Sequence, residues 1–224
     1  MGGQESIWNF GVIIHHLPYL LAGAKMTLAV AAVSIVCALV IGLFVALARM
    51  SRFRVTEFLA GLFIDIWRST PTLAQLLWVF YALPILIGFS LDPFMAGVIT
   101  LSCHYGAYLA ETFRAGILSL PIGQRQAALA LGMTRSATLR RIILPQAVTR
   151  MLPAIVSTFI VVTKESALVS MINLRDLMWH AQSLAGLTMR SMEVLTIAAL
   201  IYMVLTYPQA LLVNYLHRRY ASQG

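Results

Sequence analysis

Four charged side chains lie inside long apolar segments, and they are the residues best placed to do chemistry. They are Arg68, Glu111, Lys164 and Glu165. Ionisable residues are costly in an apolar environment, so they usually pair with one another or face a polar pathway. Because these four combine both signs of charge, they could hold a small ligand that carries an ammonium group and a carboxylate.

The spacing of the charges also allows a structural interpretation. Glu111 and Arg114 are three residues apart, as are Asp65 and Arg68, so each pair could neutralise itself on one helix face. For Glu111 and Lys164 both interpretations stay open, whereas pairing is favoured for Asp65. Adjacent helical residues point to different faces, so Lys164 and its neighbour cannot line one lumen in the same way.

The segment STPT at 69–72 is expected to interrupt a helix. Proline removes a helix hydrogen bond, and serine or threonine hydroxyls can satisfy the backbone groups that it frees. We therefore expect a break near Pro71, where exposed carbonyls could hold a ligand's ammonium group. Thr70, in this segment, and Ser166, which follows Glu165, complete the candidate pathway residues.

Five apolar stretches predict the helices that position these residues. The chain is 60% hydrophobic and only 11% charged, whereas about 25% of the residues in soluble domains are charged. A helix needs roughly 20 apolar residues to span a bilayer. The predicted spans are about 20–49, 57–88, 93–118, 150–172 and 191–216. We therefore predict an all-α integral membrane protein in which residues 1–224 form a single domain.

The distribution of basic residues predicts how the chain is oriented. Arginines are concentrated after the first span, in the long segment 119–149 and in the C-terminal tail. Because cytoplasmic connections carry an excess of Lys and Arg, the N-terminus is predicted outside and the C-terminus in the cytoplasm. This topology explains the net charge of +8 without a nucleic-acid partner. Residues 5–20 are amphipathic and predict an interfacial helix at the outer surface of the lipid bilayer.

Residues 119–149 are polar, basic and interrupted by glycine and proline. The stretches 125–133 and 135–143 predict two short helices that form a cytoplasmic hairpin. Small residues let a helix approach a partner, glycine ends a helix, and a Leu-Pro pair is expected to fix the return to the membrane. The residues concerned are Gln126, Ala127 and Ala128, then Gly132 after three residues, then Ile142 after nine more, then Leu144 and Pro145 after one.

This spacing resembles the EAA motif of the inner-membrane permeases of ABC importers, with Gln126 where that family usually has Glu. Three further segments are similar to the histidine- and glutamine-type branch, which carries polar amino acids. They are WRSTPTLAQLLWVFYALP at 67–84, AYLAETFRAGILSLPIGQ at 107–124 and LPQAVTRMLPAIVSTFIVVTKESALVS at 144–170. The resemblance implies a multi-pass permease subunit of the bacterial inner membrane, with a polar amino acid as substrate and a coupling helix that begins near Gln126.

The same resemblance implies the partners of the chain. They are a second permease chain, identical or paralogous, two ATP-binding subunits that receive the coupling helix, and an extracytoplasmic substrate-binding protein. ATP and Mg²⁺ are expected in the ATP-binding subunits, with no cofactor in this chain. If Lys164 lies on the pathway, Lys164→Met should lower uptake and leave assembly unchanged.

Two other classes of function are less consistent with the sequence. A passive channel or secondary transporter needs no docking hairpin and often contains inverted repeats, which are not seen here. A membrane enzyme is not favoured either, because the chain lacks GxSxG, HExxH and GxxxxGK[ST] motifs. We therefore predict no catalytic residue. Cys37, Cys103, His104 and His180 fit no metal-ligand spacing, so no metal site is predicted.

Overall fold

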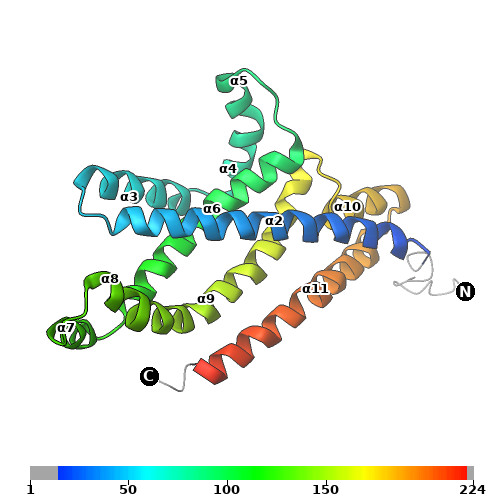
Figure 1. Cartoon of the computed structure of the whole chain (residues 1–224). Coiled ribbons are helices and arrows are strands. Elements are labelled where there is room, and N and C mark those ends of the chain that lie inside the picture. Colours follow the sequence, from blue (N-terminus) through cyan, green and yellow to red (C-terminus); the bar gives the residue numbers. More distant parts are fainter. Residues whose placement is uncertain (1–14, 221–224) are drawn as a thin grey trace, which may run out of the picture.

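The computed structural model describes residues 15–220, and within this range the chain is helical, with no strand. Residues 5–14 of the predicted interfacial helix lie outside the described range. Figure 1 shows the arrangement. The helices are α2 (Leu17–Arg49), α3 (Arg54–Ser69), α4 (Thr72–Leu77), η1 (Trp78–Ala82), α5 (Leu83–Ile87), α6 (Pro93–Leu118), α7 (Ile122–Ala130), α8 (Arg135–Thr138), η2 (Leu139–Ile143), α9 (Leu144–Glu165), η3 (Ser166–Ile172), α10 (Leu177–Thr188) and α11 (Ser191–Tyr220).

Several of these helices are long and apolar enough to cross a membrane. Three qualify by length and composition, namely Leu17–Arg49, Arg135–Ile172 and Ser191–Arg219, and a fourth is obtained if α3 and the segment Thr72–Ile87 form one bent span. Helix α6 has a sufficient length of 26 residues but does not belong to this set. Its many small and polar residues are buried, because α6 lies against α2, α3 and α9 (Figure 1).

Helices α2 and α6 form the most extensive contact in the described chain, and glycine makes this contact possible. A Cβ atom at Gly42 would lie 2.8 Å from the Cβ of Leu109 and 3.0 Å from the carbonyl oxygen of Gly106. A Cβ atom at Gly106 would lie 2.7 Å from Ile41. Small residues of this kind let helix backbones approach closely in a membrane.

The predicted helix 57–88 is broken near Pro71, as expected. Helix α3 ends at Ser69, and Thr70 is extended, with φ −114° and ψ 145°. The residue before a proline avoids helical geometry, which explains the position of the break. The two halves are bent by 107°, so α4 and α5 leave the direction of α3 (Figure 1).

The predicted cytoplasmic hairpin needs a correction in both arms. The first arm, predicted as 125–133, is α7 (Ile122–Ala130), which starts directly after Pro121 and so begins before Gln126. The arm 135–143 is not a separate short helix, because it continues through a π-helical turn into α9 and forms one long helix, Arg135–Ile172. In that turn the Leu144 N–H bonds to the carbonyl of Leu139. A wider turn accommodates the ring and the missing N–H of Pro145. The Leu-Pro pair therefore produces a local π-helical bulge, and the helix continues past it. The pair Leu83-Pro84 follows the other π-helical turn, η1, in the same way.

Helix α10 was not among the predicted helices, and a buried carboxylate holds it in place. The Asp176 side chain is 0% exposed, accepts a hydrogen bond from the Trp179 N–H at 2.9 Å and another from the Tyr202 hydroxyl of α11 at 3.3 Å. The Leu177 N–H donates to the Thr27 hydroxyl of α2 at 3.1 Å. Asp176 therefore caps α10 and joins it to α11, while the next residue joins it to α2.

The stability of this junction should depend on pH. Burial raises the pKa of Asp176 from 3.8 to about 6, although its hydrogen bonds and the nearby His180 act in the opposite direction. The folded chain then binds more protons than the unfolded chain between pH 4 and 6, so stability should fall as the pH rises through this window, by on the order of 3 kcal/mol.

Thermal unfolding of the purified chain in detergent, from pH 4 to pH 7.5, would measure this dependence. Asp176→Asn keeps a cap acceptor and cannot titrate, so it should flatten the curve between pH 4 and 6. The same slope in the wild-type chain and in this variant would contradict the assignment.

Candidate functional site

A polar cluster lies where the second predicted span is broken. The Gln75 amide donates to the carbonyl of Trp67 at 2.9 Å and to the backbone and side-chain oxygens of Thr70. Its oxygen lies 2.8 Å from Nδ1 of His104, whose Nε2 lies 3.3 Å from the Thr72 hydroxyl. The side chain of Gln75 thus satisfies the carbonyls that the helix break frees. Through His104 it also connects the broken region to α6.

Glu165 brings an incompletely bonded carboxylate to this region. Its Oε2 atom is buried and accepts no hydrogen bond from the described residues. The Tyr105 hydroxyl lies within hydrogen-bonding reach of the Glu165 carboxylate, and His104 lies close enough to interact with this carboxylate electrostatically. An unpartnered buried acceptor is costly, about 1–3 kcal/mol and more for a charged group, so Oε2 of Glu165 is a candidate acceptor for a ligand.

The other predicted pathway residues have different environments. Lys164 is exposed on the surface of α9, whereas Ser166 is buried and donates to the carbonyl of Thr163 at 2.8 Å. Arg68 is exposed and lies over the ring of Tyr108, 5.0 Å from its centre. In the described part of the chain Asp65 forms no ion pair with Arg68, so the favoured pairing of these two residues is wrong. Thr70 bonds to Gln75 and to the carbonyl of Ile66.

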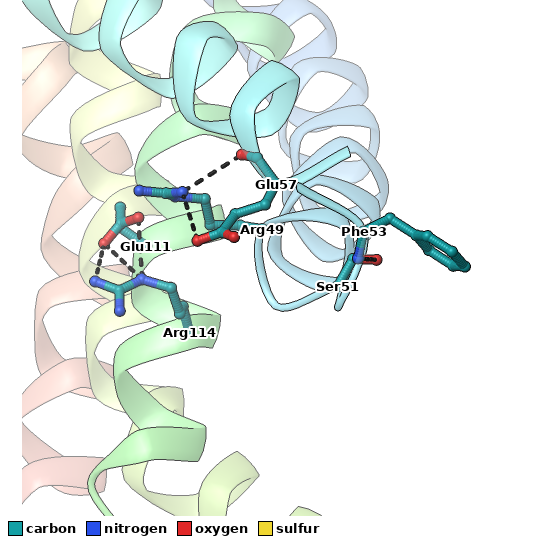
Figure 2. Close-up of polar contacts among 6 residues, drawn as sticks. All are labelled: Arg49, Ser51, Phe53, Glu57, Glu111 and Arg114. Carbon is teal, nitrogen blue, oxygen red and sulfur yellow. Dashed lines mark hydrogen bonds and ion pairs between the residues drawn. The ribbon is translucent and has the colours of Figure 1, made fainter. Parts of the chain in front are cut away.

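Glu111 lies apart from this cluster, in a group of charges on α2, α3 and α6 (Figure 2). It accepts a hydrogen bond from Arg114 at 2.7 Å, so the predicted i,i+3 pair is formed. Arg49 at the end of α2 pairs with Glu57 of α3 at 3.3 Å. The Arg49–Glu57 pair joins α2 to α3, whereas the Glu111–Arg114 pair lies within α6, and its formation favours the structural role that was open for Glu111.

Helix α7 is short, largely exposed and closed by glycine. Gly132 has a φ of 81°, and the Met133 N–H bonds to the carbonyl of Ala128 while the Gly132 N–H bonds to that of Leu129. This is a Schellman motif, which satisfies the last carbonyls of a helix and favours glycine. As predicted, Gly132 ends the helix.

The EAA-like residues do not share one exposed face. Gln126 and Ala127 are exposed, but Ala128 is only 3% exposed because this side of α7 packs on α8 and η2. The expectation that both alanines contact a partner is therefore wrong for Ala128. Ile142 and Leu144 are partly buried and Pro145 is exposed.

Two side chains of α9 fasten the segment that carries α7. Gln146 donates to the side-chain oxygen of Gln124 in α7 at 3.0 Å, and Arg150 donates to the carbonyl of Ser119 at 2.9 Å. Ser119 is the residue that caps α6. A force applied to α7 would therefore reach both α6 and α9.

No metal centre is formed by the residues that the structure describes. The sequence alone shows only that His104 fits no metal-ligand spacing, and it does not single out Gln75 or Tyr105. The available signal was Gln75 itself, a single amide within the apolar run that follows Pro71. Its partner lies 29 residues away on another helix, and only the fold brings the two together.

Comparisons with known proteins agree over almost the whole chain. Residues 38–222 match the family described as binding-protein-dependent transport system inner membrane component. The arginine transport system permease protein ArtQ of Bacillus subtilis is 39% identical over 88% of this chain and 90% of its own length. The glutamine transport system permease protein GlnP of Escherichia coli is 35% identical over 95% of this chain and 97% of its own.

Solved structures give the same assignment. A chain in the crystal structure of an amino acid ABC transporter with histidines superposes with a TM-score of 0.90 and is 36% identical, with coverage of 95% of this chain and 99% of that one. A chain of the MetNI methionine ABC transporter, 21% identical with a TM-score of 0.68, shares the fold over 88% of this chain and 95% of its own. The protein therefore belongs to the family of inner-membrane components of binding-protein-dependent transport systems.

Proposed function

We propose that this chain is the permease subunit of an ATP-driven importer that moves a polar amino acid across the bacterial inner membrane. The observation that carries the proposal is α7, a short exposed helix that is closed by Gly132 and fastened to α6 and α9. A passive channel or secondary transporter would have no use for this helix. The named substrates of the relatives, arginine and glutamine, support a polar amino acid as the cargo.

We further propose five spans with the N-terminus outside. They are α2, the broken helix α3–α5, α6, the long helix Arg135–Ile172, and α11. An odd number places the ends of the chain on opposite sides. Figure 1 is consistent with this topology, because α2 begins beside α10 whereas α11 ends on the side of α7. The arginines near α7 and in the tail then lie in the cytoplasm.

The partners proposed for the chain follow from this arrangement. Helix α7 is the coupling helix, and it docks on one of two ATP-binding subunits that hold ATP and Mg²⁺. A second permease chain, identical or paralogous, completes the translocation path, and an extracytoplasmic binding protein delivers the amino acid. Gln126 occupies the first position of the motif and offers a hydrogen bond in place of the usual carboxylate.

The proposed substrate path passes the broken helix. The orphan oxygen of Glu165 would accept a hydrogen bond from the ammonium group of the amino acid, next to the cluster of Gln75 and His104. Lys164, exposed on α9, would face the second permease chain or the lumen, where it could bind the carboxylate. Arg68, Thr70 and Ser166 are proposed to line the path, whereas Glu111 is proposed to act through its pair with Arg114.

Reconstitution would test this function. The chain would be inserted into proteoliposomes with its ATPase and second permease, and ATP hydrolysis and uptake of labelled amino acids would be measured with and without the loaded binding protein. We expect hydrolysis and uptake to rise together when the loaded binding protein is added. Uptake that needs neither ATP nor the binding protein would establish the passive alternative.

A pair of cysteine variants should locate the docking face of α7. In a chain with Cys37 and Cys103 replaced by serine, Ala127→Cys should crosslink to a cysteine in the ATPase, because position 127 is exposed. Ala128→Cys should crosslink at least about tenfold less, because a thiolate must be accessible to react.

Protein gels of the oxidised complex would measure the two yields. Each variant would first be checked for normal uptake. Efficient crosslinking at 128 and none at 127 would show that the opposite face of α7 is the docking face.

A further inference from the structure

A pocket of about 540 Å³ lies beside α7, separate from the polar cluster at the broken helix. Its volume is within the range of roughly 300–1,000 Å³ that is typical of small-molecule sites. The apolar wall comes from Met50, which directly follows α2, from Ile117 and Leu118 at the end of α6, and from Leu139 of η2. Met50 and Leu118 are 40% and 60% exposed, so this wall is open at the ends of two spanning helices.

Two arginines from α7 and α8 complete the lining. Arg125 belongs to α7 and Arg135 begins α8, so the turn between these helices brings both to one pocket. Both side chains are exposed, and neither forms an ion pair or hydrogen bond with the described residues. The guanidinium fork matches the geometry of a phosphate, and Ser136 adds a hydroxyl to the same lining.

The combination of these walls indicates an amphiphile. Free phosphate would use the arginines but would gain nothing from Met50, Leu118 and Leu139. A lipid without a phosphate would use the apolar wall but would leave both guanidinium groups without a partner, and in a zwitterionic lipid the choline cation would repel them. A molecule with an anionic phosphate head and acyl chains satisfies both parts, and basic pockets between membrane helices bind such head groups.

We propose that this pocket binds an anionic phospholipid, with its phosphate between Arg125 and Arg135 and its acyl chains along the ends of α2 and α6. The site goes beyond the proposed transport function and does not depend on it. Bound lipid would fix the distance between α7 and the ends of two spanning helices. It would thus make the position of α7 relative to these two helices more rigid.

Native mass spectrometry of the delipidated chain in detergent would test the site with two probes of equal acyl length, phosphatidylglycerol and phosphatidylcholine. We expect tighter retention of phosphatidylglycerol. Replacing both pocket arginines, Arg125→Gln with Arg135→Gln, should weaken that retention at least about tenfold and remove the preference for phosphatidylglycerol over zwitterionic phosphatidylcholine.

The matched control is Arg140→Gln with Arg141→Gln, which removes the same charge from exposed positions outside the pocket. It should retain phosphatidylglycerol like the wild-type chain. Equal losses in both double variants would overturn the proposal, because they would indicate diffuse attraction without a site. Thermal unfolding would confirm that each variant remains folded.

Two further arms distinguish the remaining occupants. Leu118→Asn should weaken phosphatidylglycerol retention, and soluble glycerol phosphate at millimolar concentration should not displace the lipid. Displacement by glycerol phosphate would establish a phosphate site and overturn the lipid assignment. Loss of ATPase binding in the Arg125 and Arg135 variant, with unchanged lipid retention, would instead assign the pocket to the ATPase interface.

Discussion

Replacing Glu165 with glutamine is expected to lower amino acid uptake by about tenfold or more. The substitution keeps the size of the side chain but removes the charge of a carboxylate whose Oε2 is buried without a partner among the described residues. A hydrogen bond between a charged acceptor and the substrate's ammonium group is worth about 1.5–3 kcal/mol, which corresponds to a factor of ten to a hundred. Uptake by the reconstituted complex would measure the effect.

The control for this prediction is Glu57→Gln. Glu57 is also a carboxylate, but it is half exposed and pairs with Arg49 away from the cluster, so its loss should cost less than about 1 kcal/mol. The amount of ATPase that copurifies with each variant should not change. Lys164→Met should lower uptake under the same conditions if Lys164 holds the carboxylate of the substrate. Normal uptake by Glu165→Gln would remove Glu165 from the proposed path.

Gly42→Leu is expected to be the most destabilising single change on the contact between α2 and α6. Any Cβ atom at this position meets the Cβ of Leu109 at 2.8 Å and backbone atoms of α6 at 3.0 and 3.2 Å, and backbone cannot move aside as a flexible side chain would. Overpacking of this kind costs about 1–3 kcal/mol or more. For a chain of this length, 3 kcal/mol corresponds to a fall of about 6–12 °C in Tm.

The matched control is Gly186→Leu on α10. No atom lies within 4 Å of a Cβ built at this position, and its φ is not in the left-handed region, so Tm should change little or rise. Thermal unfolding in detergent would measure both variants, and the yield of monodisperse protein would report on assembly. An unchanged Tm for Gly42→Leu would show that the two helices can separate at this point without loss of stability.

Some features of the fold were predictable because they depend on nearby residues. The break at Pro71 follows from the geometry that proline imposes on the preceding residue, and the end of α7 follows from the left-handed conformation of Gly132. The apolar stretches indicated membrane helices because a bilayer requires such lengths of apolar sequence.

Other features were mispredicted even though the residues that cause them can be read directly in the sequence. Pro145 was expected to separate a short helix from the next span, but a π-helical turn absorbs its ring and the helix continues. Helix α10 was overlooked because its docking depends on Asp176, Thr27 and Tyr202, which come from three distant segments. Local sequence patterns contain no information about which distant partner will satisfy a buried polar group.

The class of protein, the family resemblance, the helix break and the glycine that ends α7 follow from local sequence, whereas the start of α7 at Ile122 was placed too late in the chain. Three other features depend on how the helices pack: Ala128 faces its own chain, Gln75 meets His104, and Arg125 and Arg135 share one pocket. The physical reason is the range of the interactions involved. Backbone preferences and hydrophobic length act within a few residues, whereas burial and side-chain pairing depend on helices that meet only after the chain has packed.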